Sequence, residues 1–194
     1  MQVKQKGSFT VELALVLVFA SGIFLAVVNY MLAVNQKGQL DRATYSLTTI
    51  LAERKQLFSD DLDVCAGNCN RTKNTLFSIA SSSLRRMTPT FDKTKFGMRI
   101  DEIRLTERTL PNGQIKYTRH HKRLEKGNVI GCNFPDMEDI TEERANELLP
   151  VTSRKRRLPM YQVSLCYEIP FNLLGVTSGE VNHIISTSYS FARI

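Results

Sequence analysis

Residues 13–28 read LALVLVFASGIFLAVV, an interval that carries no charge and has Ser21 as its single strongly polar side chain. Extended to Val34, the run has 22 residues, which span roughly 33 Å as a helix, enough to cross the hydrocarbon core of a bilayer. A helix buried in a soluble core would normally show a polar face, whereas apolar residues occupy every face here. The sequence therefore predicts that this segment spans a membrane.

The remainder of the chain has the composition of one ordinary domain attached to this segment. The 194 residues are 42% hydrophobic and 23% charged, with ten glycines and a formal charge of +7. These values exclude collagen-like, coiled-coil, wholly disordered and polytopic membrane proteins. Lys4 and Lys6 precede the apolar run. By the positive-inside tendency, this short head stays cytoplasmic and residues after about Asn35 are translocated.

A secretory signal peptide has the same order of basic head and apolar run and is the alternative. The run is long for such a peptide, and no clear small-x-small cleavage site follows it, although Ala33 is a small residue near its end. Glu12 is a carboxylate just inside the start of the apolar stretch, where an ionisable group carries an insertion cost. Glu12 is therefore either an interfacial group that stays hydrated or a functional residue.

The order of residues at the N-terminus carries a resemblance to a known family. The basic leader MQVKQKG ends in Gly7, SFTVE follows, and the apolar run comes next. This order resembles the class III signal of type IV prepilins and pseudopilins. The resemblance implies that a membrane peptidase cuts between Gly7 and Ser8 on the cytoplasmic side, which makes Glu12 the fifth mature residue. Glu12 would then pair with the new α-amine of a neighbouring subunit. Because both charges lose water, we interpret that pair as a register mark for assembly.

Within this family, the chain is most similar to the minor pilins of the Flp or Tad (tight adherence) system, and to the TadF group among them. The similar parts are GSFTVELALVLVFASGIF (7–24) and the cysteine-containing domain with MYQVSLCYEIP (160–170). Mature type IV pilins commonly start with Phe or Met, whereas Ser8 comes first here. The major Flp pilin has Tyr directly after the Glu and a very short body, whereas this chain has Leu13 and some 160 residues after the apolar run. These departures indicate a low-copy component.

The resemblance implies a structural protein of pilus assembly, surface adherence and biofilm formation, without catalysis or a cofactor. Its implied partners are the prepilin peptidase, the other Tad or Flp pilins and the inner-membrane assembly platform. Its implied location is the bacterial inner membrane, in a single pass with the N-terminus cytoplasmic and the C-terminal domain periplasmic, or the surface pilus. Two alternatives stay open: an unprocessed membrane-anchored receptor or binding module, and a pilin that captures DNA.

The predicted fold is α+β, with a long N-terminal transmembrane helix and a small extracytoplasmic domain with an antiparallel sheet. The predicted parts are a leader (1–7), a transmembrane helix (8–34), a helical extension (35–58) and the extracytoplasmic domain (59–194). Within that domain we predict helices at Lys73–Met87 and from near Asp139 to Pro150, and strands at Lys95–Glu107, Gln114–Arg119, Met160–Ile169 and His183–Ile194.

Single residues and short motifs carry further structural signals. Gly38 allows a bend just outside the membrane. The sequence Leu-Pro-Asn-Gly between the first two strands predicts a hairpin turn. The apolar alternation slips between Ile100 and Ile103, which predicts a bulge. Asp139, with Glu142 three residues later, predicts a helix cap. The strand at Met160–Ile169 alternates, so one face should be core and the other wetter.

Four cysteines in a translocated domain favour disulfides over metal ligands. Three pairings are open, and we favour Cys65 with Cys69 and Cys132 with Cys166. A zinc site is the rival interpretation, but the spacings are not the usual pair of CxxC knuckles.

Charged residues gather in three tracts. The basic tracts are Lys116–Lys126 and the four residues Arg154, Lys155, Arg156 and Arg157, and the acidic tract Asp136–Glu147 lies between them. Opposite charges in one small domain can pair or stay solvated. The functional alternative is a patch for DNA, anionic lipid or an acidic partner, but aromatic interleaving is limited to Tyr117, so nucleic-acid binding is weakly supported.

The histidines form no catalytic or metal-binding motif. His120 and His121 are adjacent on a predicted strand and would point to opposite faces, and we expect all three histidines, His183 included, at the surface. The sequence has no phosphate-binding loop, nucleophile elbow or paired catalytic carboxylates. We therefore predict that the protein is not an enzyme.

Overall fold

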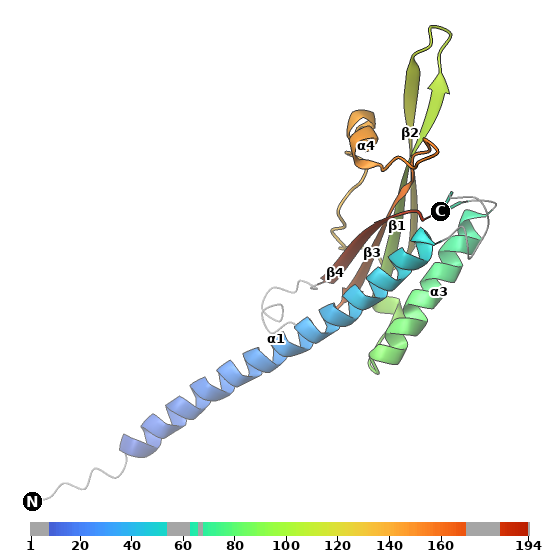
Figure 1. The fold of residues 1–194 in the computed structure, drawn as a ribbon. Coiled ribbons are helices and arrows are strands. Elements are labelled where there is room, and N and C mark those ends of the chain that lie inside the picture. Colours follow the sequence, from blue (N-terminus) through green and yellow to red (C-terminus); the bar gives the residue numbers. More distant parts are fainter. Residues whose placement is uncertain (1–7, 54–62, 66–67, 170–182, 194) are drawn as a thin grey trace, which may run out of the picture.

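The structure is a computed structural model of the chain, and it describes residues 8–53, 63–65, 68–169 and 183–193. Its longest element is α1 (Ser8–Ala52), one helix of 45 residues. The N-terminal part of α1 projects away from the rest of the molecule, and its C-terminal part lies against a β-sheet (Figure 1). The helix runs through Gly38 without a break. Residues 54–58, where the predicted extension ends, lie outside the described residues.

Four strands form one antiparallel sheet with the order β2-β1-β3-β4. The strands are β1 (Phe96–Thr109), β2 (Ile115–Gly127), β3 (Met160–Glu168) and β4 (His183–Phe191). The predicted hairpin turn joins β1 to β2. In this turn Gly113 has a φ of 79°, a conformation that favours glycine, and donates its backbone N–H to the Leu110 carbonyl oxygen over 2.9 Å. Together with α1, the sheet confirms the predicted α+β fold.

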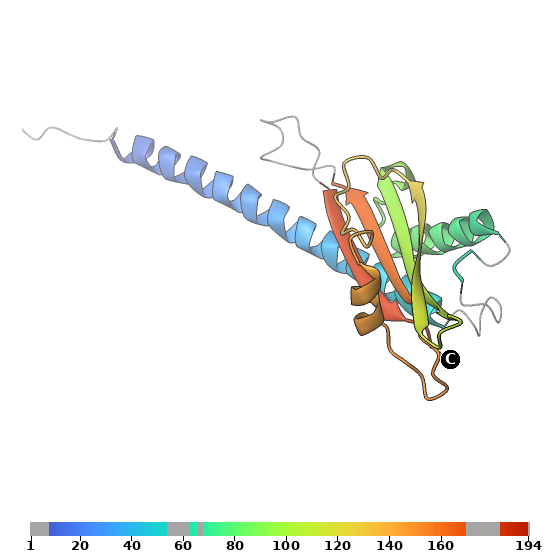
Figure 2. The same cartoon turned by 90° about the horizontal axis from the view of Figure 1, so that it is seen from above.

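Helices α1 and α3 (Cys69–Met87) cover one face of the sheet and enclose the larger core. Figure 2 shows both helices on the same side of the strands. The large, fully buried side chains of this core come from both helices and from the strands: Leu47, Leu51, Leu76, Phe96, Met98, Ile100, Tyr161 and Leu165. Helix α3 begins before the predicted Lys73, because the Asn68 side chain accepts hydrogen bonds from the backbone N–H groups of Asn70 and Arg71 and so caps it.

A smaller core lies on the opposite face, beneath α4 (Glu142–Leu148) (Figure 2). It consists of Ile103, Leu105, Met137, Ala145, Leu149 and Met160. The predicted cap at Asp139 is wrong, because the Thr141 hydroxyl accepts the Arg144 backbone N–H over 3.3 Å and caps the helix instead. The helix ends just before Pro150, as predicted.

Strand β1 is buried on both faces, which explains its irregular pattern. Its register is uniform along both neighbouring strands, so the predicted bulge between Ile100 and Ile103 is wrong. Ile100 lies in the core under α1 and α3, whereas Ile103 lies in the core beside α4. Two apolar residues at an odd spacing therefore report a strand that is covered from both sides.

Two other strands also differ from the prediction, β2 in its length and β3 in the burial of its second face. β2 continues past Arg119 to Gly127. The second face of β3, predicted to be wetter, is buried, and Gln162 and Ser164 are both 0% exposed. The Gln162 amide nitrogen donates to the carbonyl oxygen of Pro135 over 2.8 Å, so the segment after β2 covers this face and accepts one of its hydrogen bonds.

Candidate functional site

The N-terminal half of α1 is an apolar surface that no other described element covers. Its large side chains are exposed on every side of the helix, with Phe19 74%, Phe24 67% and Tyr30 72% exposed. Among the described residues, α1 is the one helix long and apolar enough to cross a membrane, and none of its most apolar stretch is buried in the molecule. The helix therefore has the length, composition and exposure of a single-pass membrane anchor.

The predicted processing and register residues lie at the start of this surface. Ser8 is the first residue of α1, and Gly7 lies outside the described residues. Glu12 is exposed and lies four residues, or about 6 Å of helical rise, beyond Ser8. Its carboxylate thus belongs to the outward surface of the apolar half, where a neighbouring helix could reach it.

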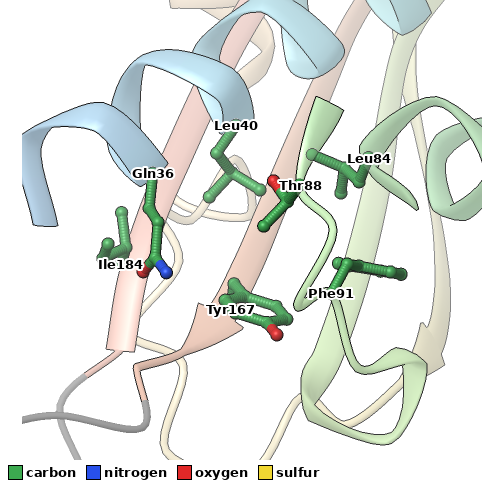
Figure 3. A pocket seen from close by; sticks show the side chains of 7 residues that line it. All are labelled: Gln36, Leu40, Leu84, Thr88, Phe91, Tyr167 and Ile184. Atoms are coloured by element: carbon green, nitrogen blue, oxygen red, sulfur yellow. The ribbon is translucent and has the colours of Figure 1, made fainter. Parts of the chain in front are cut away.

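The domain packs against one side of α1 from Gln36 onward. The buried residues recur on one side of the helix: Leu40, Ala43, Thr44, Leu47, Thr48, Leu51 and Ala52. Figure 3 shows the point of entry, where Gln36 and Leu40 face Tyr167 and Ile184 of the sheet and Leu84 of α3. These side chains border a small cavity of about 20 Å³. The N-terminal half of α1 is therefore exposed and apolar, whereas its C-terminal part packs into the core.

Hydrogen bonds fix both ends of the part of α1 that packs against the domain (36–52). Near its beginning, the Lys37 ammonium donates to the carbonyl oxygen of Ile185 in β4 over 2.6 Å. At its end, the backbone N–H of Arg193 donates to the carbonyl oxygen of Ala52 over 2.7 Å, which satisfies one of the acceptors that a helix leaves open at its C-terminus. Arg193, the last described residue, thus caps the C-terminal end of α1.

Two disulfides join Cys65 to Cys69 and Cys132 to Cys166, the pairing that the sequence favoured. The second ties the segment after β2 to β3. A His183 ring nitrogen and the sulfurs of Cys132 and Cys166 all lie within 4.8 Å of one another, the one place where the described residues approach the rival zinc site. A zinc ion would need thiolates, and the disulfide bond uses both of these sulfurs.

The predicted basic patch divides into an exposed turn and a structural arginine. Residues 154–156 are exposed, whereas the Arg157 side chain is only 12% exposed. Arg157 donates from Nη1 to the carbonyl oxygens of Asn146 (2.6 Å) and Leu149 (3.1 Å), and its guanidinium lies 4.9 Å from the centre of the Tyr117 ring. Arg157 therefore holds the end of α4 against β2.

A buried ion network connects the basic strand β2 to the acidic tract. The Asp101 carboxylate, 0% exposed, accepts from Arg99 Nε (2.9 Å) and Arg123 Nε (3.0 Å) and is 2.8 Å from His121 Nε2. Arg123 also pairs with Asp136, and its hydrogen bond to Asp101 raises the pKa of the guanidinium. The opposite charges therefore pair within the fold, one of the two outcomes that the sequence allowed.

The two adjacent histidines of β2 lie in different environments, as expected for neighbouring side chains of a strand. His120 is exposed and lies 2.9 Å from the Thr106 hydroxyl. His121 has a side chain only 13% exposed, so the prediction that it lies at the surface is wrong. The sequence signal that could have indicated this network is the pair of adjacent carboxylates, Asp101 and Glu102, between Ile100 and Ile103.

Glu102 is a second buried carboxylate, on the other face of β1. It is 2% exposed, and its Oε2 accepts the backbone N–H of Val64 over 2.7 Å. Burial raises the pKa of Glu102 to about 7, although the Val64 N–H opposes the shift. Lys122 and Arg104 lie nearby but pair with Asp63, so Glu102 is poorly compensated as an anion.

An exposed apolar helix that continues unbroken into a small disulfide-bonded α+β domain is the architecture of a single-pass membrane-anchored protein and is consistent with a pilin. The sequence model of the family "Putative tight adherence pilin protein F" (TadF) matches residues 1–193. The chain belongs to this family and is a pilin of the Tad system, in a family of structural proteins rather than enzymes. Neither a curated protein nor a solved structure matches it.

Proposed function

We propose that this Tad pilin is a minor subunit that the prepilin peptidase trims between Gly7 and Ser8. Residues 8–34 hold it in the inner membrane, with the N-terminus cytoplasmic and the domain periplasmic, until it joins or primes the pilus through contacts with other Tad pilins and the assembly platform. In that role it serves surface adherence and biofilm formation. The observation that carries the proposal is the exposure of the apolar half of α1 on all of its faces.

The all-round exposure limits what can cover this surface. Soluble monomers rarely expose contiguous apolar patches larger than a few hundred Å². A single docked partner would cover one side of the helix, whereas large apolar side chains here occupy every side, from Val11 to Val34. Lipid chains, or a bundle of similar helices, surround a helix completely. These are the two environments of a pilin, before and after its assembly.

Glu12 connects processing with assembly. A carboxylate at the edge of an apolar helix is costly in lipid, and a neighbouring cation offsets part of that cost. Cleavage after Gly7 creates such a cation, the α-amine of Ser8, on each neighbouring subunit. Because the pair forms only when two helices have the correct axial offset, it selects register.

The mass of the protein extracted from membranes tests the processing step. We expect the wild-type chain to start at Ser8 and a Gly7→Leu variant to keep its leader, because a bulky side chain replaces the bare backbone at the cleavage site. A Gln5→Leu variant, which introduces the same side chain two residues away, should still be cut. A wild-type protein that retains Met1 in cells with an active prepilin peptidase would contradict the proposal.

A pair of substitutions tests the register function. Glu12→Val should abolish surface pili while the protein remains in the membrane, and Thr10→Val, which also removes a polar side chain from the start of α1, should leave piliation near wild type. Pili are counted by electron microscopy, with membrane fractionation alongside. Normal piliation in Glu12→Val would instead favour the unprocessed receptor module.

A further inference from the structure

An open groove lies between α1 and the C-terminal end of α3, just beyond the apolar run. Its volume is about 410 Å³, and its lining residues are Val34, Asn35, Gly38, Gln39, Arg42 and Met87. Apart from the adjacent backbone of α1, a Cβ atom at position 38 would meet no other atom within 4 Å, so a larger side chain at this position would enter the groove. The Thr88 hydroxyl donates to Gln39 Oε1 and joins the two helices beside it.

The position of the groove along α1 places it at the membrane surface. This step rests on the proposed function, in which the apolar run that ends at Val34 lies in the bilayer. Arg42 is eight residues further, or about 12 Å of rise, and the headgroup layer on each side of the hydrocarbon core is roughly 5–8 Å thick. Because Cβ atoms tilt toward the helix N-terminus, the Arg42 side chain leaves the helix in the direction of the membrane.

Three exposed arginines lie in the lining of the groove or within two residues of it in the sequence. Arg42 is exposed, and Arg85 and Arg86 are exposed in the last turn of α3, immediately before Met87. Figure 1 shows that this end of α3 points toward the projecting half of α1. Within the described parts of the chain, none of the three arginines forms an ion pair, and the adjacent carboxylate of Asp41 pairs with Lys37 over 2.8 Å.

We infer that this groove binds the headgroup of an anionic phospholipid, with the guanidinium groups of Arg42, Arg85 and Arg86 as the donors to its phosphate. Guanidinium groups match phosphate oxygens in bidentate geometry, and each basic residue near an anionic membrane surface strengthens binding about five-fold. The bound lipid holds the domain at a defined depth on the membrane before assembly.

Native mass spectrometry of the full chain in detergent micelles tests this site. The chain is titrated with phosphatidylglycerol and, separately, with phosphatidylcholine of the same acyl chains. We expect wild type to prefer phosphatidylglycerol and the triple variant R42Q/R85Q/R86Q to lose about a hundred-fold in affinity for it. The matched control is R154Q/K155Q/R156Q, which removes the same charge from the exposed turn beyond α4 and should bind as wild type does.

A second variant separates the groove from the charge around it. Gly38→Leu keeps all three arginines and fills the groove, and its Cβ meets open space, so α1 should stay intact. We expect it to lose at least ten-fold in affinity for phosphatidylglycerol while the domain unfolds at the wild-type temperature. Wild-type lipid binding by Gly38→Leu would overturn the site.

The remaining outcomes are equally decisive. Equal binding of the two lipids, equal losses in both triple variants, or binding of inorganic phosphate as tight as that of the lipid would each overturn the inference. The intact mass in the same spectra reports the N-terminal residue. A start at Ser8 without lipid selectivity contradicts the lipid site alone, and a start at Met1 with selectivity supports the site while it contradicts the processing step.

Discussion

The Glu102 carboxylate accepts the backbone N–H of Val64 over 2.7 Å while it is only 2% exposed. This hydrogen bond is the one that the described residues offer to Glu102, because its other oxygen, Oε1, is buried without a partner there. A buried anion with one donor is far less stable than the same group in water. The domain therefore favours the protonated form of Glu102.

We predict that this carboxyl makes the domain less stable as the pH rises. Its pKa is about 7 in the fold against an ordinary value of 4.5, so between these values the folded state binds a proton that the unfolded state has released. The contribution to stability is complete below about pH 4.5 and is lost as the pH rises through 7. Glu102→Gln should therefore raise the free energy of unfolding at pH 8 by on the order of 1–3 kcal/mol and give no gain at pH 4.

Urea unfolding of the full chain in detergent at both pH values measures this effect. Glu125→Gln, a change at an exposed position of β2, is the control and should not alter the pH dependence. Equal stabilisation of Glu102→Gln at pH 4 and pH 8 would refute the assignment.

The two disulfides should differ in their contribution to stability. Cys132 and Cys166 are 34 residues apart and Cys65 and Cys69 only four, and a longer loop restricts the unfolded chain more. Alanine at both Cys132 and Cys166 should lower the free energy of unfolding by about 4 kcal/mol, and alanine at both Cys65 and Cys69 by about 2 kcal/mol. Urea unfolding of each double variant provides the comparison, and a larger loss for the four-residue loop would contradict this ranking.

The two halves of α1 should respond differently to the same substitution. Leu51 is 0% exposed in the core, so Leu51→Ala should lower the free energy of unfolding by about 2–5 kcal/mol. Leu17 is 60% exposed in the apolar half, and Leu17→Ala should leave the domain's stability unchanged. Thermal unfolding in detergent measures both variants, and a comparable loss from Leu17→Ala would mean that the domain also depends on the projecting half.

The adjacent residues Arg156 and Arg157 should contribute differently to the stability of the domain. Arg157 donates to two carbonyl oxygens at the end of α4, so Arg157→Ala should destabilise the domain by about 1–3 kcal/mol. Arg156→Ala, at an exposed position of the neighbouring turn, removes the same charge and should change stability by less than about 0.5 kcal/mol. Equal effects in chemical unfolding would show that charge, not the α4 contact, is what matters.

The parts of the fold predicted from sequence are those with strong periodicity or strong local turn chemistry. The unbroken apolar run predicted α1, and the strict alternation from Tyr161 to Tyr167 predicted β3. The sequence before Gly113 predicted the hairpin turn. Each of these signals lies within one element and does not depend on what packs against it.

The parts that could not be predicted depend on contacts between distant segments. Asp101 and Gln162 interrupt apolar patterns, and a polar residue within a strand normally indicates a solvent-exposed face. Here Arg99 and His121 pair with Asp101, and the Pro135 carbonyl oxygen accepts a hydrogen bond from the Gln162 amide nitrogen. The partners come from three separate segments, so the local pattern of any one strand did not reveal which groups pair with these residues.

Because α1 is one rod from Ser8 to Ala52, the molecule has no swivel between its two halves. If the apolar half of α1 packs among other helices, its rotation about the helix axis also sets the direction in which the sheet faces. A pulling force along α1 would then act on the domain as shear along the packed part of the helix, from Leu40 to Ala52.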